Sequence, residues 1–311
     1  MNILVTGGAG YIGSVLVQIL LKNNFNVTVL DNFLFKQKSL NQIKKNRQLN
    51  IVEGDVRDES IIKDLVTKSD IIIPLAALVG APLCDIKPKE AKEVNLDSMF
   101  LLKSILSKNQ RVILPVSNSG YGIGKSGEFC TEESPLNPIS LYGQTKVQSE
   151  SIIMERENSI SFRLATVFGM SPRMRIDLLV NYFVNKALTE KKIQIFEGHF
   201  KRNYVHIKDV ANVFLFTIKN FEKMKSNTYN FGLEDANFSK IELAEKIKKY
   251  INNFEIQISE FGKDPDKRDY IVSNKKILST GYKFLEDLDS GIQELIREIP
   301  NLSKNESYSN V

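Results

Sequence analysis

The segment VTGGAGYIGS, residues 5–14, places Gly7, Gly10 and Gly13 at the junction of two different patterns. The run NILVTG at 2–7 is typical of a buried strand, and residues 11–23 repeat apolar side chains at helical spacing. Glycine allows a tight turn and the close approach of another backbone, and the N-terminus of the following helix would face a bound anion. The segment predicts a dinucleotide-binding strand–turn–helix unit, although a purely structural glycine turn would leave the same pattern.

The first half of the chain continues to alternate apolar runs with helical patterns. Strands that alternate with helices predict a parallel sheet, and continuous Val/Ile/Leu runs predict that both faces of it are covered. We therefore expect an α/β, doubly wound Rossmann fold with its ligand crevice at the carboxyl ends of the strands. The expected strands are 2–7, 26–31, 49–55, 70–77, 111–117 and 159–169, and the expected helices are 11–23, 58–68, 88–108 and 140–157.

Asp31 ends the second expected strand, about twenty residues after the glycine turn. A carboxylate there can accept hydrogen bonds from both ribose hydroxyls and would repel a 2′-phosphate, so the sequence predicts NAD rather than NADP. Asp55 closes the third strand and could meet the adenine amino group. The expected cofactor-binding residues are Gly7, Gly10, Tyr11, Ile12, Gly13, Asp31, Asn32, Asp55, Val56, Leu75, Ala76, Ala77, Tyr142 and Lys146.

The pattern loosens after residue 170. We expect an NAD-binding Rossmann domain over 1–169, to which 205–235 returns, and a smaller substrate-binding lobe from 170–204 and 236–311. We expect the polar tail NLSKNESYSNV, 301–311, to fray. The elements expected in this half are helices at 176–190, 208–222 and 239–251, a strand pair around 193–207 and a strand at 228–232.

Composition excludes several classes of protein. The 311 residues carry a net charge of only +5, with lysines scattered among acidic neighbours, which argues against a nucleic-acid partner. Cys84 and Cys130 are the only cysteines, too few for a disulfide framework or a four-cysteine zinc site. His199 and His206 have no metal-ligand pattern around them, so we expect no metal. No signal peptide or membrane-length apolar run is evident, and we expect a soluble cytoplasmic protein.

The segment LYGQTK, 141–146, places Tyr142 and Lys146 four residues apart. On a helix the two side chains lie on one face, where the ammonium would favour the phenolate and let the phenol accept a proton nearer neutral pH. Tyr-x-x-x-Lys is also common in ordinary amphipathic helices, so this motif alone decides nothing.

The motifs in order along the chain resemble the extended short-chain dehydrogenase/reductases, the NAD-dependent epimerase/dehydratase family that acts on nucleotide sugars. They are TGGAGYIG, DN at 31–32, GDVRD at 54–58, LAA, SNSGYG, YGQTK and RNYVHIKDVA. The resemblance implies an enzyme with a nucleotide-sugar substrate and Tyr142 as base, Lys146 as its partner and the holder of the nicotinamide ribose, and Ser117 bonded to the reacting oxygen. Lys146 and the nicotinamide ring would lower the pKa of the phenol.

The resemblance also implies that Arg202 and Arg268 hold the substrate diphosphate, with surface ion pairs to a nearby Asp as the alternative. Asn118, Ser119 and Thr166 are the other expected substrate-binding residues. The family's dehydratases carry Asp-Glu where this chain has Asn118 and Ser119, which disfavours dehydration. Its 4-epimerases usually carry Asn where this chain has Thr166.

Longer phrases resemble the bacterial GDP-heptose 4-dehydrogenases of capsule assembly. They are LAALVGAPLC, NSGYGIG, RLATVFGMSPRMRIDLLVN and DPDKRDYIVSN. We therefore expect NAD-dependent oxidation at C4 of a GDP-heptose-like nucleotide sugar for surface polysaccharide biosynthesis, with a UDP-glucose 4-epimerase-like activity as the alternative. A non-enzymatic scaffold is disfavoured because both Tyr142 and Lys146 are present.

The expected helices 88–108 and 140–157 carry apolar residues on more than one face: Met99, Phe100, Leu101, Leu102, Val147, Ile152 and Ile153. In relatives the corresponding helix pair forms a dimer interface, so the resemblance implies a homodimer.

Overall fold

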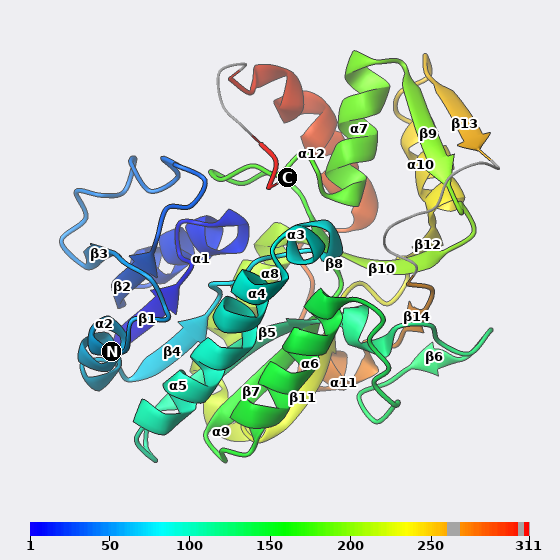
Figure 1. Ribbon diagram of the computed structural model, residues 1–311. Helices are drawn as coiled ribbons and strands as arrows, with labels where there is room; N and C mark the ends of the chain where they lie inside the picture. Colours follow the sequence, from blue (N-terminus) through cyan, green and yellow to red (C-terminus); the bar gives the residue numbers. More distant parts are fainter. Residues whose placement is uncertain (260–267, 304–307, 311) are drawn as a thin grey trace.

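The computed structural model describes residues 1–259, 268–303 and 308–310 (Figure 1). Residues 264–267 of the DPDKRDYIVSN phrase and 304–307 of the tail lie outside the described residues. The strands are β1 (Asn2–Thr6), β2 (Asn26–Asp31), β3 (Leu49–Glu53), β4 (Ile71–Pro74), β5 (Arg111–Ser117), β6 (Phe129–Cys130), β7 (Ser159–Leu164), β8 (Thr166–Phe168), β9 (Lys192–Phe196), β10 (Lys201–His206), β11 (Asn227–Phe231), β12 (Asn237–Ser239), β13 (Glu255–Ser259) and β14 (Ile271–Val272).

The α-helices are α1 (Tyr11–Lys22), α2 (Glu59–Thr67), α3 (Ala81–Ile86), α4 (Pro88–Lys92), α5 (Ser98–Ile105), α6 (Leu141–Met154), α7 (Leu179–Thr189), α8 (Ile207–Lys219), α9 (Phe221–Met224), α10 (Lys240–Lys248), α11 (Lys275–Ser279) and α12 (Leu288–Glu298). A π-helical turn, η1, covers Glu93–Asp97, and 3₁₀ turns cover Asn118–Tyr121 (η2) and Ile299–Asn301 (η3).

Seven strands form one parallel sheet in the order β11-β7-β5-β4-β1-β2-β3. The predicted doubly wound α/β fold is confirmed. From β1 the chain runs outward through β2 and β3, then returns to place β4 on the other side of β1. The carboxyl ends of β1 and β4 therefore form the switch point at which such sheets bind ligands.

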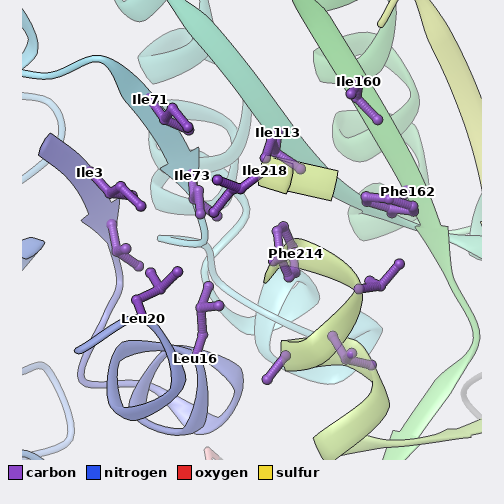
Figure 2. Packing of buried hydrophobic residues seen from close by; sticks show 14 of the residues in the cluster. Ile3, Leu16, Leu20, Ile71, Ile73, Ile113, Ile160, Phe162, Phe214 and Ile218 are labelled. Atoms are coloured by element: carbon purple, nitrogen blue, oxygen red, sulfur yellow. The ribbon is translucent and has the colours of Figure 1, made fainter. Parts of the chain in front are cut away.

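Both faces of the sheet are covered because successive side chains of a strand point to opposite faces. Ile3 and Val5 of β1 pack with Leu16 and Leu20 of α1 and Phe214 of α8 on one face (Figure 2). Leu4, between them, packs on the other face with residues of α2, α5 and α6. The continuous apolar runs of the strands thus serve two cores at once.

A smaller lobe lies beyond the carboxyl ends of the strands (Figure 1). Its core is built by α7, α10 and α12 together with β9 and β10. Small sheets accompany this core, with the strand orders β12-β10-β8 and β13-β9, and the pair β14-β6 lies beside them. None of the helices in the described residues is long and apolar enough to cross a membrane.

Three expected elements differ from the structure. Residues 159–169 are not one strand. The strand of the main sheet, β7, ends at Leu164, and Ala165 N donates a hydrogen bond to the Phe231 carbonyl. The next residues form β8, which pairs with β10 in a separate sheet. The strands near 193–207 do not pair with each other, since β9 pairs with β13 and β10 with β8 and β12. The expected helix 88–108 is interrupted by η1, and α3, which precedes it, was not expected.

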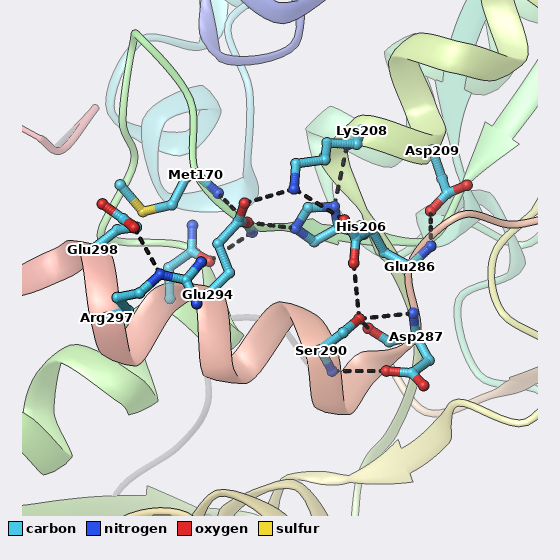
Figure 3. A network of polar contacts seen from close by, with 12 residues as sticks. Met170, His206, Lys208, Asp209, Glu286, Asp287, Ser290, Glu294, Arg297 and Glu298 are labelled. Carbon is cyan, nitrogen blue, oxygen red and sulfur yellow. Dashed lines mark hydrogen bonds and ion pairs between the residues drawn. The ribbon is translucent and has the colours of Figure 1, made fainter.

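A buried polar network joins the lobe to the Rossmann half (Figure 3). His206, at the end of β10, is fully buried, and its Nε2 lies 2.8 Å from Glu294 Oε2 on α12. The Lys208 ammonium pairs with Glu294 at 2.7 Å and with Glu286 at 2.9 Å. His206 thus links the end of β10 to α12.

Candidate active site

A cavity of about 600 Å³ opens at the carboxyl ends of the central strands and reaches the smaller lobe. Every residue expected to bind the cofactor lines it, including Tyr142 and Lys146, and Ser117 lines it too. We call the wall made by the glycine turn and the residues at and after the ends of β2, β3 and β4 the cofactor half. It comprises Gly7, Gly10, Tyr11, Ile12, Gly13, Asp31, Asn32, Asp55, Val56, Leu75, Ala76 and Ala77.

The glycine turn packs so closely that side chains cannot be added. Gly7 has φ +68°, and a Cβ on it would lie 2.6 Å from the backbone nitrogen of Ala76. A Cβ on Gly13 would lie 2.5 Å from the carbonyl oxygen of Gly7. Since α1 begins directly after Gly10 and has no acidic residue in its first turn, its N-terminus can receive a pyrophosphate. The turn fits a dinucleotide.

Asp31 is buried at the cavity wall, where its carboxylate accepts hydrogen bonds from Ala9 N and Phe33 N, both at 2.9 Å, and from Gln37 Nε2 at 3.1 Å. Burial raises the pKa of Asp31, and these three hydrogen bonds oppose the rise because they favour the charged form. Asp31 therefore has the position expected of a ribose acceptor, and its orientation is fixed by the backbone of the turn.

Asp55 also lines the cavity, but a neighbour already engages its carboxylate. Arg57 donates from Nε to Asp55 Oδ1 at 2.9 Å and from Nη2 to Oδ2 at 2.8 Å. These bonds lower the pKa of Asp55. Any bond to an adenine amino group would share oxygens with this ion pair, which the sequence did not indicate.

Ser117, Tyr142 and Lys146 come from two adjoining elements. Ser117 ends β5, and the other two residues lie one turn apart at the start of α6, which is capped by the Ser140 hydroxyl accepting from Gly143 N at 3.1 Å. The Ser117 side chain lies close enough to the Tyr142 phenol to lower its pKa. The structure thus brings the three predicted catalytic residues together on the cavity wall.

The side chains of the protein do not bring the Tyr142 phenol toward neutrality, contrary to the expectation from the motif. Burial raises its pKa to about 12, and Arg268, Arg175 and the Ser117 hydrogen bond only partly oppose that rise. Burial also lowers the pKa of Lys146 to about 8, since Lys146 is only 7% exposed. Desolvation of the two groups therefore outweighs the attraction between the Lys146 ammonium and the Tyr142 phenolate that their spacing suggested.

The opposite wall, which we call the substrate half, is contributed largely by the smaller lobe. It contains the expected Thr166, Arg202 and Arg268, and three residues that sequence reasoning missed, Arg175, Asp177 and Lys240. Arg175 forms a two-bond ion pair with Asp177, from Nε at 3.0 Å and from Nη2 at 2.6 Å. Arg202 and Arg268 both approach Tyr270, the first with Cζ 6.0 Å from the ring centroid and the second with Nη1 3.4 Å from the hydroxyl.

Two expected substrate-binding residues do not line the cavity. Asn118 and Ser119 lie in the 3₁₀ turn η2 and are each 1% exposed. The turn directs them into the protein, where the Asn118 amide atoms and Ser119 Oγ have no hydrogen-bond partner among the described residues. The structure thus places both side chains away from the cavity wall, and their contact with a substrate stays a prediction.

Residues 308–310 pack against the cavity, so the prediction of a frayed tail is wrong for them. Ile176 N donates to the Tyr308 carbonyl at 2.8 Å, and Arg173 Nη2 donates to Asn310 Oδ1 at 3.1 Å. Ser309 and Asn310 line the cavity with Arg173, whose guanidinium lies 5.1 Å from the Phe35 ring centroid. The partners are 130 or more positions away in sequence, and no local pattern in the tail signals them.

Comparisons with known proteins agree with this geometry. Residues 3–232 match the NAD dependent epimerase/dehydratase family. The chain is 26% identical over 307 residues to the low-salt glycan biosynthesis protein Agl12 of Haloferax volcanii, covering 95% of this chain and 97% of that protein. It is 29% identical over 274 residues to a UDP-glucose 4-epimerase of Lactobacillus helveticus, covering 80% and 81%.

Solved structures share the fold. A UDP-glucuronic acid 4-epimerase from Bacillus cereus, solved with UDP-glucuronic acid and NAD, has a TM-score of 0.85 and 22% identity, covering 97% of this chain and 100% of that one. Since the family match spans most of the chain, the resemblance seen in the motifs is confirmed at the level of the family, and so is its cofactor. The chain belongs to the NAD-dependent epimerase/dehydratase family and is an enzyme that uses NAD.

Proposed function

We propose that the protein is a nucleotide-sugar 4-epimerase, which oxidises C4 of the sugar and returns the hydride to the opposite face of the ring. The observation that carries the proposal is that Ser117, Tyr142 and Lys146 line the same cavity as the cofactor half and the basic residues of the substrate half. Relatives named for 4-epimerisation of UDP-sugars match in sequence and in fold, which favours this outcome over the others open to the family.

The charges of the cavity suit a substrate that carries a diphosphate. Six of the described lining residues are Lys or Arg and three are Asp, and one of those Asp residues, Asp177, is paired with Arg175. A surplus of cations on a concave wall attracts an anionic ligand. The diphosphate would anchor the substrate while the sugar reaches Tyr142.

Each catalytic side chain has a defined task. Tyr142 takes the proton of the C4 hydroxyl when the ring is oxidised and gives a proton back when it is reduced, which is general base and then general acid catalysis. Ser117 holds the reacting oxygen by a hydrogen bond, and Lys146 holds the cofactor ribose. NAD⁺, when bound, supplies the hydride acceptor. Because burial raises the pKa of Tyr142 to about 12, the positive nicotinamide ring of bound NAD⁺ would favour loss of the phenol proton.

Release of the 4-keto sugar is the second candidate function. Thr166 lines the cavity at the position where the 4-epimerases of the family usually carry Asn, and the longer phrases resemble the GDP-heptose 4-dehydrogenases. Dehydration is disfavoured, because Asn118 and Ser119 replace the Asp-Glu pair of the dehydratases and are buried. In either case, the glycan biosynthesis relative supports a role in polysaccharide assembly.

The experiment is to incubate NAD-loaded protein with UDP-glucose, UDP-glucuronic acid and a GDP-heptose, then trap ketones with borodeuteride and analyse the sugars by NMR. Inversion at C4 without trappable ketone or net NADH supports the epimerase. Deuterium at C4 of released sugar would replace it with the dehydrogenase. An absence of both products with every nucleotide sugar tested would overturn the shared oxidation step.

We also propose a homodimer formed through α5 and α6. Of the apolar residues on these helices, Met99, Leu102, Ile152 and Ile153 are buried in the chain's own core, whereas Phe100 is 55% exposed. Leu101 and Val147 are partly exposed beside it. Phe100 is therefore the residue that a second copy would cover, and sedimentation of a monomer at micromolar concentration would contradict the proposal.

A further inference from the structure

Lys240 is a buried cation to which no motif assigns a role. It is the first residue of α10, follows the capping residue Ser239, and is 5% exposed while lining the cavity. Its ammonium donates to the Phe196 carbonyl and lies 5.6 Å from the Phe200 ring centroid. Lys240 thus adds a positive charge to the wall of a ligand-sized cavity, where it can attract an anionic ligand.

Strand register brings Lys240 next to the arginines of the substrate half. In the antiparallel pair of β10 and β12, Arg202 lies opposite Phe238 and Lys201 lies opposite Ser239. Lys240 directly follows this ladder, two residues after Phe238, so its side chain starts diagonally from that of Arg202. Arg202 is itself only 3% exposed and lines the same cavity, as does Arg268.

We propose that Lys240 completes, with Arg202 and Arg268, a three-cation site for the diphosphate of the substrate's nucleotide. The inference rests on the proposed function, because it takes the ligand of this half to be a nucleotide sugar. Guanidinium forks bind phosphate oxygens in pairs, and a lysine ammonium adds a compact charge that can meet an oxygen the forks leave open. A third cation would attract a diphosphate more strongly than it would attract a neutral nucleobase.

The test is calorimetry on NAD-saturated protein, so that the cofactor half is blocked. The ligands are inorganic pyrophosphate and whichever of uridine, thymidine and guanosine diphosphates the unmodified protein binds best. We expect Lys240→Met to weaken both ligands by the same factor, roughly 10- to 100-fold, because one charge-assisted contact is lost. Lys240→Arg should recover most of the affinity. Lys249→Met, which changes an exposed lysine at the far end of α10, should have no effect.

The outcomes distinguish a failure of the proposed function from a failure of the role assigned to Lys240. If the unmodified, NAD-saturated protein binds none of these ligands, the proposed function fails. If it binds them and Lys240→Met binds equally well, only the assignment of Lys240 fails. A loss confined to the nucleoside diphosphate, with pyrophosphate unchanged, would place Lys240 at the base and also overturn the proposal. In turnover, Lys240→Met should raise KM for the nucleotide sugar and leave kcat within about twofold, the pattern of lost ground-state binding.

Discussion

The two halves of the cavity are built in different ways. The cofactor half is made mainly of backbone: Gly7 and Gly13 leave no room for a Cβ, and Asp31 accepts hydrogen bonds from the backbone amides of Ala9 and Phe33. The substrate half is made of long side chains, such as Arg202, Lys240 and Arg268, which come from a strand, a helix and a loop respectively. A half that depends on backbone geometry tolerates little substitution, whereas one built of side chains can be changed one contact at a time.

The largest effect should come from Tyr142, which lines the cavity that both halves share. We expect Tyr142→Phe to lower the rate of hydride transfer by roughly 10² to 10⁴, the usual contribution of a general base, and to leave both halves able to bind. Single-turnover reduction of NAD followed by absorbance measures the rate, and calorimetry measures NAD binding. Turnover at the normal rate would remove Tyr142 from the mechanism.

Gly13→Ala tests whether the cofactor half is as intolerant as its packing indicates. The added Cβ would meet the Gly7 carbonyl oxygen at 2.5 Å, so the backbone must move and we expect NAD affinity to fall by roughly 100-fold. Gly127→Ala is the matched control, since Gly127 has φ +77° but nothing within 4 Å of its Cβ position. Normal NAD affinity in the Gly13 variant would show that the two halves do not differ in this respect.

Asp31 is the side chain of the cofactor half that we expect to select NAD over NADP. Asp31→Ala removes the ribose acceptor and the charge that repels a 2′-phosphate, so we expect the preference for NAD over NADP to fall by roughly tenfold. Asp31→Asn keeps an acceptor oxygen and isolates the contribution of the charge. Titrations of both cofactors measure the ratio, and an unchanged ratio in both variants would exclude Asp31 from the ribose site.

The smallest effect concerns Glu294, which joins the lobe to the Rossmann half. Burial raises the pKa of its carboxyl, but hydrogen bonds from His206 and Lys208 outweigh burial and lower the pKa from 4.5 to about 2. A depressed pKa stabilises the fold above the unfolded value and ceases to do so as pH falls through the folded one. The stability difference between the unmodified protein and Glu294→Gln should therefore be full near pH 6 and shrink between pH 4.5 and 2. Chemical denaturation across this range measures it, and a difference independent of pH would contradict the pairing.

The same contrast explains what could be predicted from the sequence. The glycine turn, the strand ends at Asp31 and Leu75, and the Tyr142–Lys146 pair are local patterns, and the structure places all of them on the cavity. Lys240 sits in a run of lysines and glutamates that reads as a solvated helix, and only the β10–β12 register brings it to the cavity. The inward turn of Asn118 and Ser119, and the raised pKa of Tyr142, depend on burial, which spacing along a chain does not reveal.

The packing of residues 308–310 has a practical consequence for handling the protein. Because Asn310 lies on the cavity wall beside Arg173, a purification tag or fusion partner attached after this residue would begin next to the cavity. Met1 is 51% exposed and precedes β1, at the amino ends of the parallel strands and away from the smaller lobe (Figure 1). Fluorophores, surface anchors and affinity tags are therefore better attached before Met1, where they leave the cavity unobstructed.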